Sequence, residues 1–251
     1  MKYHEIRVKK PHMYLVPLGD IHIGDKHCDY NLLQRNIDWI RDEPNAYTFL
    51  MGDILNTATR TSKSSPFEQD LTLQEQVEKA VELFTPIKDK IIGCISGNHE
   101  QRLSDLVGYD PLTAVCLALG VPYFGFSVAL ICNVGKTKKS IGYVGYMHHT
   151  TGGGATPGSK INRVNKLRSI VSNADFYCGG HNHALGVVPA TTRTVDVIHK
   201  TIQVKKQYLI DCGGYLEWDE SYAESKGLEP TKLGSPRMRL NGTRRDLHCS
   251  V

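Results

Sequence analysis

The sequence has no closely spaced pair of cysteines. Its seven cysteines are scattered along the chain, and none of them lies in a C-x-x-C motif. The ligand spacing of a zinc ribbon is therefore absent. Several of the cysteines lie inside apolar, strand-like segments, so we expect buried free thiols rather than a cysteine metal site.

Long apolar runs and a strong excess of one charge are also missing. The longest apolar runs have the length of a strand, and residues 1–10 are mostly polar and charged. Neither a membrane span nor a signal peptide is visible, so we expect a cytoplasmic protein with no membrane partner. The formal charge of +4 is too small to indicate nucleic acid by itself, but it permits an anionic substrate.

No internal repeat, low-complexity block or interdomain linker is visible. A chain of 251 residues with 40% hydrophobic content can bury one sizeable core. We therefore predict a single domain over residues 1–251, with a polar C-terminal extension, residues 219–251, packed on it. Residues 237–240 are expected to form a final edge strand.

Apolar segments of strand length alternate with segments of helical spacing. Strands are predicted within 7–18 and at 47–51, 91–95, 141–147 and 174–178, with a strand pair over 121–134 and three or four short strands over 185–212. Helices are predicted at 30–41, 71–84, 111–119 and 161–171. Asp29 is expected to cap the first helix. Polar residues 57–66 and glycine-rich residues 150–160 are expected to form loops.

Side chains that can bind metals follow five of these strands. Open α/β sheets place their ligands at the carboxyl ends of strands, so we expect these side chains to meet. They are Asp20 and His22, Asp53, Asn98 with His99 and Glu100, His148 and His149, and His181 and His183.

The donors are numerous enough for two metal ions. One metal takes about four to six ligands, and carboxylate, amide and imidazole donors together suit Mn, Fe or Zn. A shared carboxylate would hold two metals ~3.5–4 Å apart, the separation used in two-metal phosphoryl chemistry. The donors are Asp20, His22, Asp53, Asn98, one of His148 and His149, His181 and His183.

The five segments, in this order, resemble the calcineurin-like metallophosphoesterases. The matching motifs are Asp20-x-His22, Gly52-Asp53, Gly97-Asn98-His99-Glu100, His149 and Gly180-His181-x-His183. A weaker likeness of Cys212–Leu216 to the closing strand of such domains extends the match to most of the chain. The resemblance implies an α/β fold, a four-layer α-β-β-α sandwich in which two face-to-face mixed β-sheets are flanked by helices.

The resemblance also implies a role for each matching residue. It places Asp20, His22, Asp53 and His183 around the first metal, with Asp53 as the bridge. It completes the second metal with Asn98, His149 and His181. His99 is not a ligand in the family pattern but lies beside the leaving group. We expect two divalent ions, Mn²⁺ first, with Fe, Zn, Ni or Mg as alternatives.

Three positions leave two interpretations. Many relatives have Gly after the fourth-segment histidine, whereas this chain reads His148-His149-Thr150. We favour His149 as the ligand because it stands nearer the glycine-rich loop. Glu100 either supports a ligand or is a helix-start carboxylate at the favourable end of the dipole. Arg102 either clamps a phosphate oxygen or pairs with a surface acid.

The first functional hypothesis is metal-dependent hydrolysis of a phosphate ester. A hydroxide between the two metals would attack phosphorus in line. The metals and Asn98 would stabilise charge on the phosphoryl oxygens, and His99 would be the general acid. We prefer a phosphodiesterase or nuclease, with a phosphomonoesterase, including a protein phosphatase, as the alternative.

The substrate preference depends on the glycine-rich loop and on a basic helix. The basic side chains of that helix either line a path for nucleic acid or a nucleotide or form a solvated face, and they are Lys160, Arg163, Lys166 and Arg168. A hypothesis of another class is a non-catalytic metal-binding scaffold. Such a scaffold would be expected to have lost a ligand or His99, and none of them is missing. The oligomeric state is left open.

Overall fold

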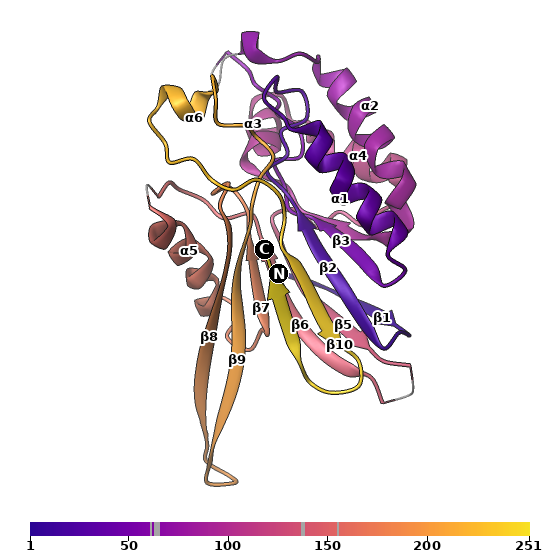
Figure 1. Cartoon of the computed structure of the whole chain (residues 1–251), viewed down its shortest axis with the longest axis vertical. Coiled ribbons are helices and arrows are strands. Elements are labelled where there is room, and N and C mark those ends of the chain that lie inside the picture. Colours follow the sequence, from indigo (N-terminus) through magenta and orange to yellow (C-terminus); the bar gives the residue numbers. More distant parts are fainter. Residues whose placement is uncertain (61, 63–65, 137–138, 155) are drawn as a thin grey trace.

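The computed structural model describes residues 1–60, 62, 66–136, 139–154 and 156–251 (Figure 1). Of the loops predicted at 57–66 and 150–160, residues 61, 63–65 and 155 lie outside the described residues. The strands are β1 (Lys2–Val8), β2 (His12–Leu18), β3 (Ala46–Leu50), β4 (Ile91–Cys94), β5 (Ser127–Val134), β6 (Ile141–His148), β7 (Phe176–Gly179), β8 (Leu185–Asp196), β9 (Thr201–Cys212), β10 (Arg237–Asn241) and β11 (Leu247–Ser250). The helices are α1 (Tyr30–Asp42), α2 (Leu73–Phe84), α3 (Asn98–Val107), α4 (Pro111–Leu119), α5 (Pro157–Lys166) and α6 (Tyr222–Ser225), with 3-10 turns η1 (Pro66–Glu68), η2 (Thr85–Lys90) and η3 (Leu167–Ser169).

The strands form two mixed sheets. The first sheet has the order β1-β5-β6-β7-β9-β8, and the second has the order β11-β10-β2-β3-β4. Neighbours β6, β7 and β9 are parallel in the first sheet, and β2, β3 and β4 are parallel in the second. Their carboxyl ends therefore gather at one end of each sheet, where the candidate metal ligands follow.

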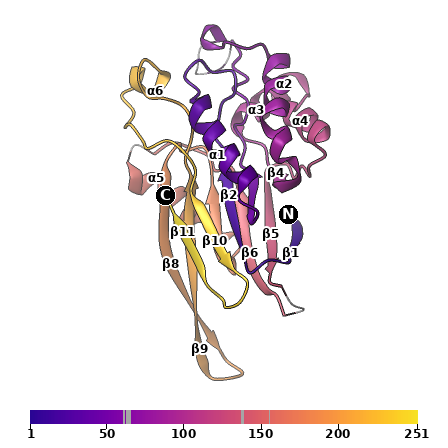
Figure 2. The same cartoon turned by 45° about the vertical axis from the view of Figure 1, so that its right-hand side comes forward.

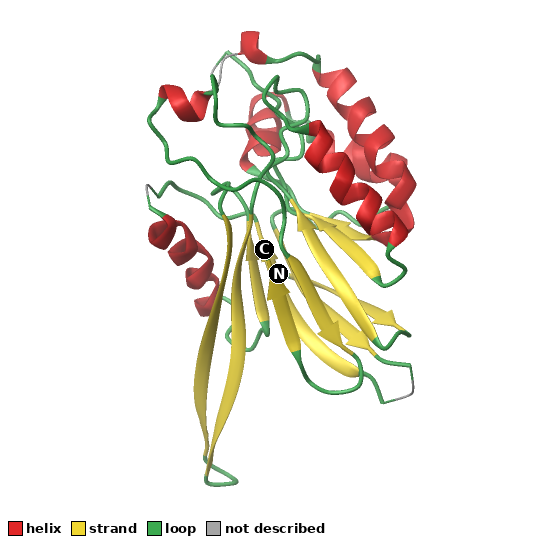
Figure 3. Ribbon diagram, in the orientation of Figure 1, coloured by secondary structure: helices red, strands yellow, loops and turns green. Residues whose placement is uncertain are grey.

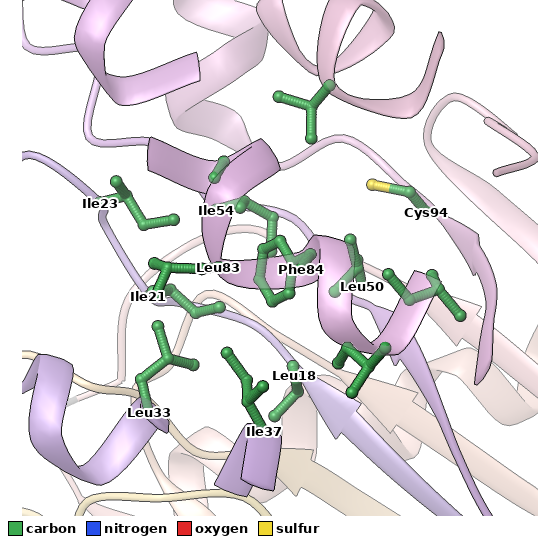
Figure 4. Packing of buried hydrophobic residues seen from close by; sticks show 14 of the residues in the cluster. Leu18, Ile21, Ile23, Leu33, Ile37, Leu50, Ile54, Leu83, Phe84 and Cys94 are labelled. Carbon is green, nitrogen blue, oxygen red and sulfur yellow. The ribbon is translucent and has the colours of Figure 1, made fainter. Parts of the chain in front are cut away.

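The outer layer on the second sheet consists of α1, α2 and α4 (Figures 2 and 3). Figure 4 shows Leu33 and Ile37 of α1 and Phe84 of α2 packed with Leu18 and Leu50 of the strands. Asp29 accepts a hydrogen bond from the backbone N–H of Leu32 at 2.8 Å, so the predicted cap of the first helix is confirmed. Burial of this apolar face fixes the helices on the sheet.

Two more apolar clusters complete the layers. Alternate side chains of β2, such as Met13 and Leu15, turn away from the helices and pack with Leu130 and Cys132 of the first sheet. On the far face of the first sheet, Val164 of α5 is buried among aromatic and aliphatic side chains. The predicted four-layer α-β-β-α arrangement is confirmed.

Several predicted elements were wrong. The strand pair over 121–134 is a single strand, β5, preceded by an isolated bridge between Cys94 and Tyr123. Residues 2–8 form β1, an edge strand missed because its residues are mostly polar. Helix α5 begins at Pro157, inside the predicted loop 150–160, because Thr156 caps it.

The largest correction concerns residues 185–212. They form two twelve-residue strands, β8 and β9, in one antiparallel hairpin rather than several short strands. The far end of this hairpin extends well below the rest of the molecule in Figure 1. Residues 237–241 are also not an edge strand, because β10 pairs with both β2 and β11.

The prediction for cysteines holds. All seven cysteines are free, six are buried, and Cys249 is partly exposed. Among the residues described, no helix combines the length and the apolar character that a bilayer-spanning segment needs.

Candidate metal centre

The turns after β2 and β3 are joined by backbone hydrogen bonds. The N–H of Asp20 donates to Gly52 O at 3.1 Å, and the N–H of Ile21 donates to Asp53 O at 2.8 Å. Both carboxylates are almost completely buried. The pairing of parallel strands therefore brings Asp20 and Asp53 to one place although they are far apart in the sequence.

The segment Gly97–Glu100 approaches the same place from β4. Glu100 is buried, and its carboxylate accepts the backbone N–H groups of Gly97 at 2.9 Å, Asp53 at 3.0 Å and Leu55 at 2.9 Å. In return, Oδ1 of Asp53 accepts the N–H of His99 at 2.8 Å. Both interpretations of Glu100 fit these contacts, because it accepts the N–H of Gly97 at the start of α3 and also holds the backbone of the candidate ligand Asp53.

The histidines after β6 and β7 complete the cluster. His149 donates from Nδ1 to Met51 O at 2.8 Å, which turns its Nε2 towards Asn98 Oδ1 at 3.1 Å and Asp53 Oδ2 at 3.3 Å. The backbone N–H of His181 donates to both carboxylate oxygens of Asp20, at 2.9 and 2.8 Å. The side chain of His181 also contacts Asn98 Oδ1 through Nδ1.

Among the described residues, three groups of donors can be formed in which the ligand atoms lie within 4.8 Å of one another. The groups are Asp20, His22 and His183; His22, Asp53 and His99; and Asp53, His149 and His181. Asn98 joins the last group through its contacts with His149 and His181. All seven ligands expected from the sequence therefore lie in one cluster, and Asp53 belongs to two of its groups.

The backbone at this cluster is strained. Five of the expected ligands have positive φ, a region that non-glycine residues rarely occupy, and they are Asp20 (50°), His22 (57°), Asp53 (48°), His181 (78°) and His183 (50°). Each such residue costs about 1–3 kcal/mol and persists only where the surrounding structure enforces it. Concentration of this strain at one point is typical of a functional site.

The donor atoms fit a cation. A carbonyl oxygen only accepts, so Nδ1 of His149 carries a proton, and in the neutral ring Nε2 is a lone pair. That lone pair faces the oxygens of Asn98 and Asp53, which are also acceptors. Three acceptors that point at each other need a positive charge between them, which either a proton on Nε2 or a bound metal ion supplies. A divalent metal fits this arrangement.

The electrostatics of the cluster lead to the same conclusion. Burial alone would lower the pKa of His149, but the carboxylates of Asp53 and Asp20 raise it to about 10. Burial raises the pKa of Asp20 to about 7. For Asp53 burial acts in the same direction, but the surrounding histidines, first His149 and then His99, hold its pKa well below the usual range. The cluster attracts positive charge.

His99 lies at the border of the cluster. Its Nδ1 donates to Asn56 O at 2.6 Å, so Nε2 is the ring nitrogen left for other partners. Its ring packs edge-on against that of His22, with 4.4 Å between the ring centroids. Burial lowers the pKa of His99, and the charge of Asp53 opposes this shift.

Other candidates from the sequence lie elsewhere. His148 lies outside the three donor groups. Within the described part of the chain, Arg102 donates to the hydroxyl of Ser62 at 2.5 Å. In the basic segment, Arg163 donates to Gly153 O at 2.5 Å and Arg168 to Gln207 at 3.1 Å, so both have structural partners.

Two supporting residues were missed in the sequence. The buried side chain of Gln76 accepts the N–H of Thr57 at 3.0 Å, and the hydroxyl of Thr57 donates to His99 O at 2.7 Å. Thr57 also has positive φ, 44°. The position of Gln76 in the sequence was the available signal, because it falls on the same buried face of α2 as Ala80 and Phe84. A polar side chain on a buried face needs a specific hydrogen-bond partner.

Comparison with known proteins agrees with this geometry. The sequence model of the calcineurin-like phosphoesterase family matches residues 18–185, more than half of the chain. The chain belongs to the calcineurin-like phosphoesterase family. Membership supports metal-dependent hydrolysis of a phosphoester, with divalent ions that the Asp and His groups described above are able to hold.

Solved structures of two other proteins are similar to this phosphoesterase chain. One is a conserved uncharacterised protein of Streptococcus pneumoniae TIGR4, described as a predicted phosphoesterase, with 9% identity, a TM-score of 0.40, and 95% of this chain and 88% of that chain covered. The other is Vps29 of Entamoeba histolytica in complex with Zn²⁺, with 9% identity, a TM-score of 0.43, and 95% and 97% covered. No curated protein sequence matches the chain.

Gly97→Ala tests the close contact between Gly97 and Asp53. A Cβ at position 97 would lie 2.1 Å from Oδ1 and 2.2 Å from the backbone nitrogen of Asp53. The carboxylate must move, so we expect this variant to lose most of its bound metal and its phosphoesterase activity. Gly186→Ala is the matched control, because its Cβ would meet nothing within 4 Å. Metal content per chain, measured after gel filtration, decides the outcome, and normal metal content in Gly97→Ala would contradict the geometry.

Proposed function

We propose that this chain is a dinuclear metallophosphoesterase that hydrolyses phosphodiesters. The observation that carries the proposal is that Asp53 forms one donor group with His149 and His181 and another with His22, which also belongs to the group of Asp20 and His183. Asp20, His22, Asp53 and His183 would hold one ion, and Asp53, Asn98, His149 and His181 the other. When bound, the two ions would lower the pKa of water to about 7 and neutralise charge on the phosphoryl oxygens.

The protein's own groups have two further tasks in this proposal. Asn98 lies at the N-terminus of α3, where its side chain and the helix dipole favour a phosphoryl oxygen. As an imidazolium, His99 would protonate the departing oxygen from Nε2, because the Asn56 carbonyl holds its Nδ1–H. Burial opposes this charged form, and the carboxylate of Asp53 favours it. The same hydrogen bond orients the ring, so little reorganisation is needed when substrate binds.

A phosphodiester suits the cluster better than a monoester. A cavity of about 180 Å³ opens beside Asn98 and His149. His99 lies against His22, in another donor group. A leaving group at His99 and a second substituent in the cavity would use both sides of the centre. A monoester has no second substituent to place there.

Several predictions from the sequence stay predictions. They include Mn²⁺ as the native ion, a nuclease among the phosphodiesterases, and a cytoplasmic location. The single-domain organisation also stays a prediction, although it is supported by the insertion of β10 between β2 and β11. Arg102 as a phosphate clamp has weak support, since its side chain already donates to Ser62.

The function is tested by hydrolysis with and without metal. Metal-stripped protein reloaded with Mn²⁺ should hydrolyse bis(p-nitrophenyl) phosphate faster than p-nitrophenyl phosphate, because only the diester fills both sides of the centre. Chelation should abolish both reactions. The release of nitrophenolate measures them. A faster monoester reaction would make the protein a phosphomonoesterase, and absence of both with two metals bound would favour a binding scaffold.

The adjacent histidines give the second test of the centre. His149→Ala removes an imidazole that faces Asp53 and Asn98, so bound metal and activity should both fall strongly. His148→Ala should keep two metals per chain. Elemental analysis of both variants measures the difference. The reverse order would assign the ligand to His148.

The third test separates leaving-group chemistry from metal binding. His99→Asn should keep both metals yet lose rate, since a general acid contributes about 10²–10⁴-fold. The loss should be large for an alkyl or nucleoside leaving group and small for nitrophenolate, which leaves without a proton. The measurements are the hydrolysis rates of the two ester types and the metal content of the variant. Loss of metal would make His99 a ligand, as its distance from His22 and Asp53 also allows.

A further inference from the structure

The cavity beside the metal centre has features that the hydrolysis mechanism does not use. Its lining includes Asn98 and His149 of the donor cluster, together with Phe126, His148 and Gln101. Its volume of about 180 Å³ is close to the ~150 Å³ of an engineered cavity that binds benzene. One planar ring therefore fits, next to the point where phosphorus would lie.

Phe126 is an aromatic side chain presented to solvent by an anchored backbone. Its side chain is 60% exposed, unlike that of Phe124, which packs against the core between the sheets. Gly125, with φ of +78°, makes the turn that directs the chain outward, and Gly125 O accepts the N–H of Ser96 at 2.7 Å. This hydrogen bond ties Phe126 to the segment that leads into Asn98.

The strand pairing places His148 next to Phe126. Ser127, the residue after Phe126, pairs with His148 across β5 and β6. Among the residues that the structure describes, Nδ1 of His148 is a buried polar atom with no hydrogen-bond partner. A buried polar group of this kind is normally satisfied by a partner such as a ligand or water. Because this atom has almost no exposed surface, it is the rest of the His148 ring that lines the cavity.

Gln101 adds a second polar group to the cavity. It lies on α3, one turn after Asn98, and its side chain is exposed at the cavity. The amide of glutamine offers both a donor and an acceptor, the pair that reads the edge of a base. An aromatic face combined with such edge groups is how proteins bind a single unstacked base.

We infer that this cavity binds the nucleobase of a nucleotidyl phosphodiester, with the base stacked on Phe126 and its polar edge near His148 and Gln101. The inference rests on the proposed function and names its substrate class. The nucleoside in the cavity is the group that stays on phosphorus, while the leaving group departs at His99. Phe126 is a binding residue for the substrate and takes no part in the bond cleavage.

The test compares three diesters with one leaving group. They are thymidine 5′-(p-nitrophenyl phosphate), phenyl p-nitrophenyl phosphate and methyl p-nitrophenyl phosphate. The Mn²⁺-loaded protein should have the highest kcat/KM for the thymidine ester and the lowest for the methyl ester. Phe126→Ala should lose about 5- to 150-fold with the thymidine ester, the range that base–aromatic stacking contributes. Its rate with the methyl ester should not change.

Two variants control for indirect effects. Phe126→Tyr keeps the ring and should keep the preference for the thymidine ester. Phe67→Ala removes a phenylalanine that is 95% exposed and does not line the cavity, so its kinetics should match those of the wild type. Metal content should be equal in all of these proteins. Gln101→Ala should reduce the preference for thymidine over phenyl, because the edge contact distinguishes a base from a plain ring.

The outcomes separate this inference from the proposed function. Equal kcat/KM for thymidine and methyl esters, or an equal loss for both in Phe126→Ala, would overturn the base site and leave the phosphodiesterase intact. If none of the esters is hydrolysed, calorimetry with thymidine 5′-monophosphate decides. Binding weakened by Phe126→Ala would then support the base site without catalysis, and unchanged or absent binding would overturn it.

Discussion

The buried carboxylate of Glu100 is the constraint on which the rest of the centre depends. It accepts three backbone N–H groups from two segments, the turn after β3 and the start of α3. Burial raises its pKa to about 8, and the neighbouring charge of Asp53 acts in the same direction. The hydrogen bonds from the backbone amides of Leu55 and Gly97 favour the charged form and oppose this rise in pKa. The position of Asp53 then follows, and with it both groups of donors.

The strained ligands show how the fold and the function are coupled. Positive φ at Asp20, Asp53 and His181 would not persist in isolated turns, since each such residue costs about 1–3 kcal/mol. Here the turns are held by parallel strands, by backbone hydrogen bonds between them, and by the contact of Gly97 with Asp53. These backbone conformations direct the side chains of Asp20, Asp53 and His181 towards one point. A rigid, preorganised set of donors favours a metal with a defined geometry.

The cavity gives the centre two distinct sides. His99 lies against His22, while Phe126 and His148 line the cavity beside His149. Under the proposed function, one substituent of a diester would depart at His99 while the other is held in the cavity. The family motifs account for the donors, whereas Phe126, with its exposed ring, lies outside those motifs. The proposed substrate class therefore depends on residues outside the shared motifs.

The sequence by itself determined the chemistry of the site and the order of its parts. Donor residues after apolar strands, from Asp20 to His183, were identifiable because side-chain type and local periodicity are local properties. Only the tertiary structure decided which member of the pair His148 and His149 faces Asp53, because strand pairing sets the direction of neighbouring side chains. It also decided the contacts of Glu100, the long β8–β9 hairpin and the place of Phe126. Those depend on contacts between segments distant in the chain, which no local pattern contains.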